Sequence, residues 1–302
     1  MELIKFGLDS RVHGSYERTY QDFINKNIPA CQLSIGNTVN LYDLVKSKKL
    51  LNSNPNFYTC FHGNITLNLA GSTDGSSDPQ YGRKLTNCKN KLLRELDIAT
   101  FLEKGVIVHV GTQKDEKVGL RTVVNTINEV LMLENCDTVS YSRHSGINIK
   151  EFRDKRRIIL ENSAKKGNQL GDKLEHISII LSQINPSLRD NVSVCIDTCH
   201  LHDAGQYDLG KTEEVHKFYK DFTENIGINK LECFHLNDAM YEFGSRADVH
   251  AHLTQGHIFG KENGELGLKE FVKKTSEYSI PMIGEFSDGK GEQDIDVIKR
   301  LF

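Results

Sequence analysis

Eight short apolar runs, rich in β-branched residues and separated by longer helical patterns, constrain the fold of this chain most. Parallel strands are buried on both faces and read as continuous apolar runs, and a strand followed by a helix, repeated eight times, is typical of a (β/α)₈ barrel. The runs are 3–8, 31–35, 57–61, 106–110, 158–160, 192–196, 231–236 and 281–286. The helical patterns that follow them are 15–27, 40–51, 85–104, 119–134, 169–184, 211–226, 266–278 and 292–301. The sequence therefore predicts an α/β protein, a single (β/α)₈ TIM barrel domain over 1–302.

Length and composition agree with one barrel and set the expected compartment. The 302 residues suit a single domain of this type, and no apolar run approaches the roughly 20 residues of a membrane span. The first residues, 1–5, lack the features of a signal peptide. Seven cysteines without a Cys-x-x-Cys pair favour free thiols in a reducing compartment. We expect an intracellular protein, cytoplasmic or nuclear, that is monomeric and makes no membrane contact.

Histidines and acids fall at the ends of the predicted strands. The run 192–196 leads directly to Asp197, and His200 follows three residues later. Catalytic groups in such barrels sit at the carboxyl ends of the strands, and zinc takes about four imidazole nitrogens and carboxylate oxygens. The nine candidate ligands are His62, His109, Glu161, Asp197, His200, His235, Asp248, His250 and Glu285. We expect them to hold two or three divalent metals.

Each candidate also has a purely structural interpretation when it is considered alone. A single histidine on an apolar strand is more often a hydrogen-bonded core residue. Glu161 or Glu285 could form a buried ion pair, and 197–200 could be a helix-capping turn. Nine such groups buried together without metals would leave unpaired charge on the order of several kcal/mol per site. The metal interpretation is therefore favoured.

The remaining cysteines and histidines near these motifs are not expected to bind metal. Cys195 and Cys199 have no partner cysteines at the spacing of a zinc–thiolate site, so they are expected to pack beside the sixth strand. The other seven histidines, among them His202, His252 and His257, are expected at the surface or behind the ligands.

Three motifs resemble the endonuclease IV family of apurinic/apyrimidinic (AP) endonucleases. The family's first motif, His-x-x-Tyr, two apolar residues and Asn-Leu-Ala or Asn-Leu-Gly, stands here as 62–70. Its second, an apolar strand that ends in Asp-Thr-Cys-His, is matched by 194–200. Its third, His-x-Asn-Asp leading to Gly-Ser-x-x-Asp-Arg-His, is matched by 235–250 with two basic positions changed. With 108–109, 160–162 and Glu285, the resemblance follows essentially the whole chain in order.

The resemblance implies a zinc-dependent AP endonuclease of base excision DNA repair. Such an enzyme hydrolyses the phosphodiester 5′ to an abasic site in double-stranded DNA and leaves a 3′-hydroxyl and a 5′-deoxyribose phosphate. It would hold three Zn²⁺ per chain, and a hydroxide between two zincs is a strong nucleophile near neutral pH. Glu161 would bridge two ions, and Glu285 is the candidate for orienting the hydroxide. The three expected ligand groups are His62, His109 and Glu161; Glu161, Asp197, His235 and Glu285; and His200, Asp248 and His250.

The departures from the family pattern are all at DNA-contact positions. Ile65 stands where the family has a tyrosine, and Met240 and Val249 replace basic residues. Val39 stands at about the place of a duplex-penetrating arginine. We therefore expect weaker DNA engagement, or engagement through other loops, of which 71–83 is one candidate. Family members also repair damaged 3′ ends or act as 3′→5′ exonucleases, and the sequence does not decide whether this chain does.

The net charge of −3 gives no sign of a nucleic-acid protein until the metals are counted. Three divalent ions would turn the balance positive and concentrate that charge at the mouth of the barrel. The stretch 137–157 is predicted to be a long polar loop that is basic at its end. These basic residues, with two lysines that follow the next strand, could extend the positive charge along the phosphates, and a solvated helix face and loop is an equally good interpretation of the same set. Its members are Lys150, Arg153, Lys155, Arg156, Arg157, Lys165 and Lys166.

Two other functions remain open at the level of the sequence. Metal-dependent sugar isomerases and epimerases of the xylose isomerase type share the barrel and hold one or two metals with the same ligand types. The additional pair Asp248 and His250 argues against them, since a site with one or two metals has no need of a third group. A non-catalytic DNA-binding protein with a decayed site is disfavoured because every ligand position is intact.

Overall fold

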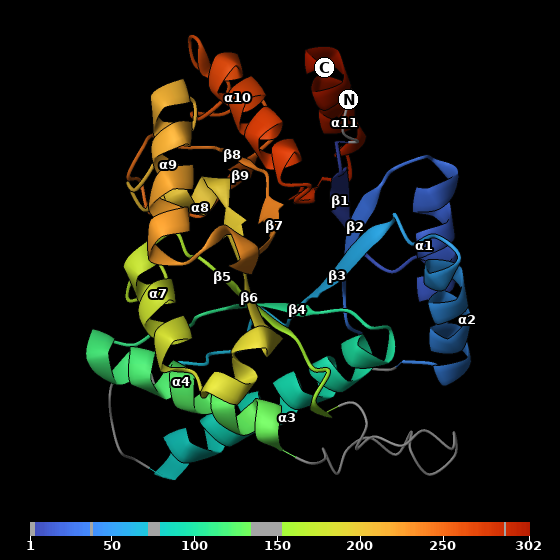
Figure 1. Ribbon diagram of the computed structural model, residues 1–302, viewed down its shortest axis with the longest axis vertical. Helices are drawn as coiled ribbons and strands as arrows, with labels where there is room; N and C mark the ends of the chain where they lie inside the picture. Colours follow the sequence, from blue (N-terminus) through green and yellow to red (C-terminus); the bar gives the residue numbers. More distant parts are fainter. Residues whose placement is uncertain (1–3, 37–38, 72–78, 134–152, 287) are drawn as a thin grey trace.

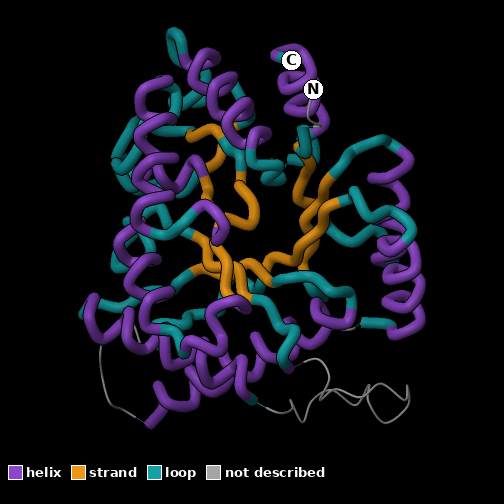
Figure 2. The backbone as a smooth tube through the Cα atoms, in the orientation of Figure 1, coloured by secondary structure: helices purple, strands orange, loops and turns teal. Residues whose placement is uncertain are grey.

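Eight parallel strands close into a barrel with helices around it (Figures 1 and 2). The computed structural model describes residues 4–36, 39–71, 79–133, 153–286 and 288–302, and the side chains from residue 84 onward in the helix that begins at Pro79. The strands are β1 (Phe6–Ser10), β2 (Ala30–Ser34), β3 (Tyr58–His62), β4 (Val106–His109), β5 (Ile158–Glu161), β6 (Val192–Asp197), β7 (Leu231–His235) and β10 (Met282–Gly284). Their order around the barrel is β1-β10-β7-β6-β5-β4-β3-β2, so the first and last strands complete the ring. The predicted (β/α)₈ barrel is confirmed.

Helices follow the strands on the outside, where Figure 1 shows them surrounding the ring. They are α1 (Tyr16–Asn25), α2 (Leu41–Asn52), α3 (Pro79–Phe101), α4 (Glu116–Met132), α7 (Leu174–Gln183), α9 (Thr212–Asn225), α10 (Gly264–Glu277) and α11 (Glu292–Leu301). Shorter pieces join them: η1 (Pro186–Asn191), α8 (Thr198–Asp203), η2 (Ile228–Lys230) and a two-stranded antiparallel sheet of β8 (Asp238–Ala239) and β9 (His250–Ala251). None of the helices in the described part of the chain is long and apolar enough to cross a membrane.

Local capping explains where several helices begin. The side chains of Ser15, Asn40 and Asp115 accept hydrogen bonds from backbone N–H groups in the first turns of α1, α2 and α4. Because Asp115 is the cap, α4 starts three residues before the predicted 119. In contrast, α7 starts later than the predicted 169, because Gly171 takes a left-handed turn at φ 91°.

Two hydrophobic layers hold the barrel together. The larger one lies between strands and helices, and it includes aromatic rings such as Phe218, Phe234 and Phe271. The smaller one fills the barrel interior with Cys60, Ile107, Ile159, Cys195 and Cys233. The six cysteines in the described residues are all free and buried, as predicted, and Cys136 lies outside these residues.

The predicted loops 71–83 and 137–157 lie mostly outside the described residues. From the loop 71–83, residues 72–78 are not described, and 79–83 form the start of α3 rather than a loop. From 137–157, only 153–157 are described.

Candidate metal centre

All nine predicted ligands gather at the carboxyl end of the barrel. Seven of them line a cavity of about 690 Å³ at its mouth, and the other two, Asp197 and His235, are fully buried beneath. Strand ends supply His62, His109, Glu161, Asp197 and His235, and Glu285 follows β10 directly. His200 lies in α8, while Asp248 and His250 come from the segment that ends in β9. Side chains that are 223 residues apart in sequence, such as His62 and Glu285, thereby share one site.

Possible ligand atoms fall into groups whose members lie within 4.8 Å of one another. The predicted three are His62, His109 and Glu161; Glu161, Asp197, His235 and Glu285; and His200, Asp248 and His250. A fourth group, Asp197, Cys199 and His250, overlaps them. Glu161 belongs to two of the groups, which is the arrangement expected of a bridging carboxylate. These groups could hold metal ions.

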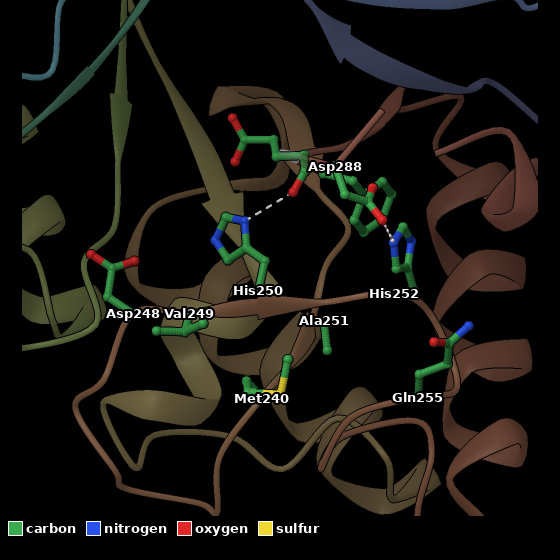
Figure 3. Close-up of a pocket in the computed structure, with 10 residues that line it drawn as sticks. Met240, Asp248, Val249, His250, Ala251, His252, Gln255 and Asp288 are labelled. Carbon is green, nitrogen blue, oxygen red and sulfur yellow. Dashed lines mark hydrogen bonds and ion pairs between the residues drawn. The ribbon is translucent and has the colours of Figure 1, made fainter. Parts of the chain in front are cut away.

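The histidines are oriented by acceptors that bind one ring nitrogen and leave the other facing the cluster. His62 Nδ1 donates to the Gly63 carbonyl at 2.7 Å, and His200 Nδ1 donates to the Asn162 carbonyl at 2.9 Å. His250 Nδ1 donates to the Glu285 carbonyl at 3.2 Å, the bond drawn as a dashed line from His250 in Figure 3. Histidines that bind metals are typically fixed in this way, with the second N–H on a carbonyl or carboxylate.

Several atoms on the inner side of the cluster have no hydrogen bond from the described residues. They are His109 Nδ1, Glu161 Oε2 and His250 Nε2. Glu161 Oε2 lies 3.4 Å from His62 Nε2 and 3.5 Å from His109 Nδ1, and His250 Nε2 lies 3.5 Å from Asp197 Oδ2. Buried polar atoms that lack a partner are costly, and these point at one another around shared spaces. A divalent cation is the partner that would satisfy all of them, so the residues fit a metal.

Protonation compensates for the crowded carboxylates when no cation is bound. Burial alone would lower the pKa of His62, but the contact with Glu161 and the charges of Glu161 and Glu285 raise it to about 9. Burial alone would raise the pKa of Glu161, whereas His109 and His235 hold it well below its usual range. The pKa values of His200 and His235 are also raised, because nearby carboxylates outweigh burial. Glu161 alone would raise the pKa of His109, but burial and the charges of His62 and His200 lower it. The carboxylates therefore favour protonation of His62, His200 and His235, and not of His109.

Asp197 caps a helix and also belongs to one of the groups of possible ligands. One carboxylate oxygen caps α8 by accepting from His200 N at 2.9 Å, and the other accepts from Asn237 Nδ2 at 2.7 Å. Asn162 pairs with the Asp197 backbone, since its Oδ1 accepts from Asp197 N at 2.7 Å. The capping turn is confirmed, and the helix that it starts carries His200 in the cluster, so the cap is compatible with a ligand role for Asp197.

Loop geometry fixes the ligands that lie beyond the strands. Asp248 adopts a left-handed φ of 59°, and its N–H donates to the buried Asp203 carboxylate at 2.7 Å. Asn68, in the first motif, ties the segment after β3 to the segment after β4 by donating to Thr112 O and accepting from Thr112 N. Asn68 therefore connects the segments that follow His62 and His109, and Asp203 fixes the backbone at Asp248.

Two polar side chains beside the cluster escaped the sequence analysis. Gln32, in the middle of β2, contacts both Glu285 and His235, and Asp9, at the end of β1, lies beside it. Gln32 is fully buried. The available signal was a polar residue inside the apolar run 31–35, and an acid at the boundary of the first run.

The remaining histidines and cysteines mostly follow expectation. The Cys199 thiol donates to Asp203 Oδ2 and to Val249 O, and Cys195 packs inside the barrel. His252 pairs with Asp294 and Asp288, and His257 pairs with Glu242 at the surface. His202 is buried, with Nε2 on the Tyr241 carbonyl, and supports the segment that carries Asp248.

Of the four positions that depart from the family at DNA contacts, three are exposed at the mouth and one is not. Ile65 is 81% exposed, and Met240 and Val249 are 46% and 38% exposed. Met240 and Val249 border a second cavity of about 480 Å³, which shares Asp248, His250 and Glu285 with the first (Figure 3). Val39 is buried, so the valine at this position is not available to penetrate DNA.

The expected basic extension of the mouth is largely wrong. Residues 153–157 precede β5 and therefore lie at the amino end of the barrel, opposite the cluster. Arg156 is fully buried and forms an ion pair with Asp97 at 2.9 Å. Only Lys165 and Lys166 follow β5 on the mouth side, where Lys165 pairs with Asp172. Lys150 lies outside the described residues.

Comparisons with known proteins place this arrangement in a family. The profile of the xylose isomerase-like TIM barrel family matches residues 82–274, about two thirds of the chain. This chain belongs to that family. Its relatives include an endonuclease 4 of Acanthamoeba polyphaga mimivirus, 29% identical over 227 residues, which cover 74% of this chain and 64% of that protein. Another is an endonuclease 4 of Carboxydothermus hydrogenoformans, 31% identical over 198 residues, which cover 65% of this chain and 60% of that protein.

These relatives confirm the resemblance to the endonuclease IV family, although each match spans less than two thirds of the relative's own length. Solved structures agree on the fold. Endonuclease IV from Thermus thermophilus superimposes with a TM-score of 0.73 at 19% identity, covering 98% of both chains. A D-tagatose 3-epimerase-like protein superimposes with a TM-score of 0.65 at 19% identity, covering 98% of this chain and 96% of its own.

Proposed function

We propose that this protein is a zinc-dependent AP endonuclease that cuts DNA on the 5′ side of abasic sites. Nine ligand-type residues gather in three groups at the mouth of the barrel, and several of their buried polar atoms have no hydrogen-bond partner among the described residues. This observation carries the proposal. The endonuclease 4 relatives supply the substrate class. The products would be a 3′-hydroxyl and a 5′-deoxyribose phosphate.

Three zinc ions would be held by the three groups. Bound divalent ions would lower the pKa of water toward neutrality and neutralise phosphate oxygens. Glu161 would bridge, since Oε2 faces His62 and His109 while Oε1 lies 2.8 Å from His235 Nδ1. Glu285 Oε1 is held by Gln32, so Oε2 is the atom left to face the metals and to orient the attacking water.

The mouth favours a sugar–phosphate without a base. The cavity of about 690 Å³ is lined mainly by the ligands and by small polar residues such as Ser34, Thr66 and Ser163. A nucleotide must leave the duplex to reach ligands at the bottom of such a cavity, and this costs least when no base has to be unstacked. Selectivity for an abasic nucleotide therefore needs no pocket that recognises a base.

Incision of one synthetic duplex tests the reaction. A tetrahydrofuran abasic analogue cannot undergo β-elimination, so a hydrolase cuts the duplex and a lyase does not. We expect a cut on the 5′ side that leaves a primer which a polymerase extends. The matched control is Glu242→Gln, a surface carboxylate on the same rim, which should cut normally. An intact duplex, under conditions in which an established AP endonuclease cuts, would refute the proposal.

Metal counting separates this function from the sugar isomerases and epimerases. Elemental analysis of the active, purified protein should find about three zinc ions per chain. A single tightly bound metal, together with conversion of a ketohexose into its epimer, would instead favour the epimerase. The third group, His200, Asp248 and His250, is the feature that makes the two outcomes different.

A further inference from the structure

Gln32 touches two of the candidate ligands from behind. It lies in β2, it is fully buried, and its side-chain amide spans the gap between His235 and Glu285. Its Nε2 donates to Glu285 Oε1 at 2.7 Å and to Asp9 Oδ1 at 3.3 Å. Its Oε1 accepts from His235 Nε2 at 2.8 Å.

The carboxylates decide which way round the amide lies. Carboxylate oxygens of Glu285 and Asp9 only accept hydrogen bonds, so the NH₂ group must face them. The carbonyl then faces His235 and can only accept, which places a proton on His235 Nε2. Nδ1 is left as the ligand atom, 2.8 Å from Glu161 Oε1 and 3.2 Å from Glu285 Oε2. A flipped amide would lose two hydrogen bonds and would favour the wrong ring nitrogen.

Gln32 also selects the metal-facing oxygen of Glu285. With Oε1 held by the amide, Oε2 is directed to the side where His235 Nδ1 lies and where Asn237 Nδ2 approaches to 3.5 Å. Gln32 therefore contacts two candidate ligands of one group, His235 and Glu285, through the atoms that face away from the proposed metal. Among the described acceptors that orient His62, His200, His235 and His250, Gln32 is the one that is a side chain, so it can be removed by substitution.

We propose that Gln32 is a positioning residue for the metal group of Glu161, Asp197, His235 and Glu285, where it fixes Nδ1 of His235 and Oε2 of Glu285 as the ligand atoms. Asp9 completes the arrangement by holding the NH₂ end of the amide. The inference rests on the proposed metal centre, and it does not depend on which substrate that centre serves.

The test uses zinc alone, without DNA. Gln32→Met keeps the length of the side chain and removes its hydrogen bonds to Glu285, Asp9 and His235. Gln32→Asn keeps an amide that is one methylene too short to reach. Each should weaken binding of one zinc ion roughly 10- to 100-fold in chelator competition, while the others stay tight. Thr59→Val in the neighbouring strand β3, which loses a buried hydroxyl next to Cys31, is the control and should bind zinc like the parent chain.

A spectroscopic measurement distinguishes positioning from simple packing. In the zinc-loaded parent protein, long-range ¹H–¹⁵N spectra should show a histidine signal, absent in His235→Asn, with its proton on Nε2 and its metal on Nδ1. In Gln32→Met and Gln32→Asn this pattern should be lost or mixed. Zinc affinities within twofold of the parent chain and an unchanged pattern would overturn the proposal, even if urea unfolding shows lower stability. Because no DNA is present, failure here is separate from failure of the AP endonuclease assignment.

Discussion

The two ends of this barrel bury charge in opposite ways. At the amino end, Arg156 and Asp97 neutralise each other, and the guanidinium also donates to the carbonyls of Val130 and Leu133. At the carboxyl end, Glu161, Asp197 and Glu285 meet histidines, with no arginine or lysine contact among the ion pairs of the described residues. A buried charge that is matched by an opposite charge in the chain needs no further counter-charge. Buried carboxylates that depend on protonated histidines instead mark a place for a cation.

The largest expected effect is at the carboxyl end and concerns activity. Glu285→Gln removes a charged ligand while preserving its shape, and it should lower incision of abasic duplex about a thousandfold, because several kcal/mol of metal-dependent stabilisation depend on this oxygen. Glu161→Gln should also weaken the bridged pair of metals. Single-turnover incision and elemental analysis measure these effects. Near-normal turnover in Glu285→Gln would show that this residue has no role in the mechanism. It would also contradict the assignment of function to the carboxyl end of the barrel.

At the amino end the expected effect is on stability and not on activity. Arg156→Met leaves Asp97 buried without its counter-charge and should lower the free energy of unfolding by about 3–5 kcal/mol. Adding Asp97→Leu should recover most of that loss. Urea unfolding measures the stability, and zinc content and incision should stay at the parent level in the folded fraction. Loss of zinc in Arg156→Met would show that the two ends are coupled.

The pH dependence of stability should differ between metal-free and zinc-loaded protein. The pKa of His62 is about 9 in the folded chain and ordinarily 6.5, so its folded value is the higher one. The stabilisation from protonated His62 is therefore complete below pH 6.5 and is lost as the pH rises through 9. Metal-free protein should lose stability over this range, whereas bound zinc requires neutral histidines and should abolish that loss. Urea unfolding between pH 6.5 and 9 measures the free energy of unfolding of both forms. Equal dependence of this free energy on pH in the two forms would contradict the raised pKa of His62 in the metal-free protein.

The smallest expected effect concerns DNA affinity at the rim. Met240→Lys together with Val249→Arg places charge where the mouth is apolar, and each phosphate that these side chains neutralise should steepen the log–log salt dependence by about 0.9. Abasic-duplex binding from low to moderate salt measures this slope, with zinc content unchanged. The matched control is Met132→Lys with Tyr278→Arg, two exposed residues at the carboxyl-terminal ends of α4 and α10, towards the amino end of the barrel. Equal slopes for the two double variants would mean that DNA does not approach positions 240 and 249.

Much of the fold and of the ligand set could be predicted from local sequence. Continuous apolar runs reveal parallel strands because both faces of such strands are buried, so the eight strands were found to within about three residues at most ends. Residues at strand ends could be assigned to the mouth because parallel strands all point the same way. His62, Glu161 and Asp197 needed no further information to be placed on one rim.

The basic residues show where the same reasoning failed. The predicted run 158–160 already began at the first residue of β5, so the residues before it could have been assigned to the amino end of the barrel. Because β5 starts at Ile158, residues 153–157 belong to the amino end. Arg156 was assigned to solvent by its charge, and it is buried because Asp97 in α3 supplies the opposite charge from 59 residues away.

What the sequence by itself determined is the barrel, the rim and the residues available to bind metal. Only the tertiary structure decided which atoms face one another. Gln32 and Asp9 join Glu285 because barrel closure places β1 between β2 and β10, and the histidine nitrogens are selected by carbonyls from distant segments. Hydrogen-bond partners of this kind are set by distances of about 3 Å between elements far apart in the chain. No periodicity or motif within a single segment encodes them.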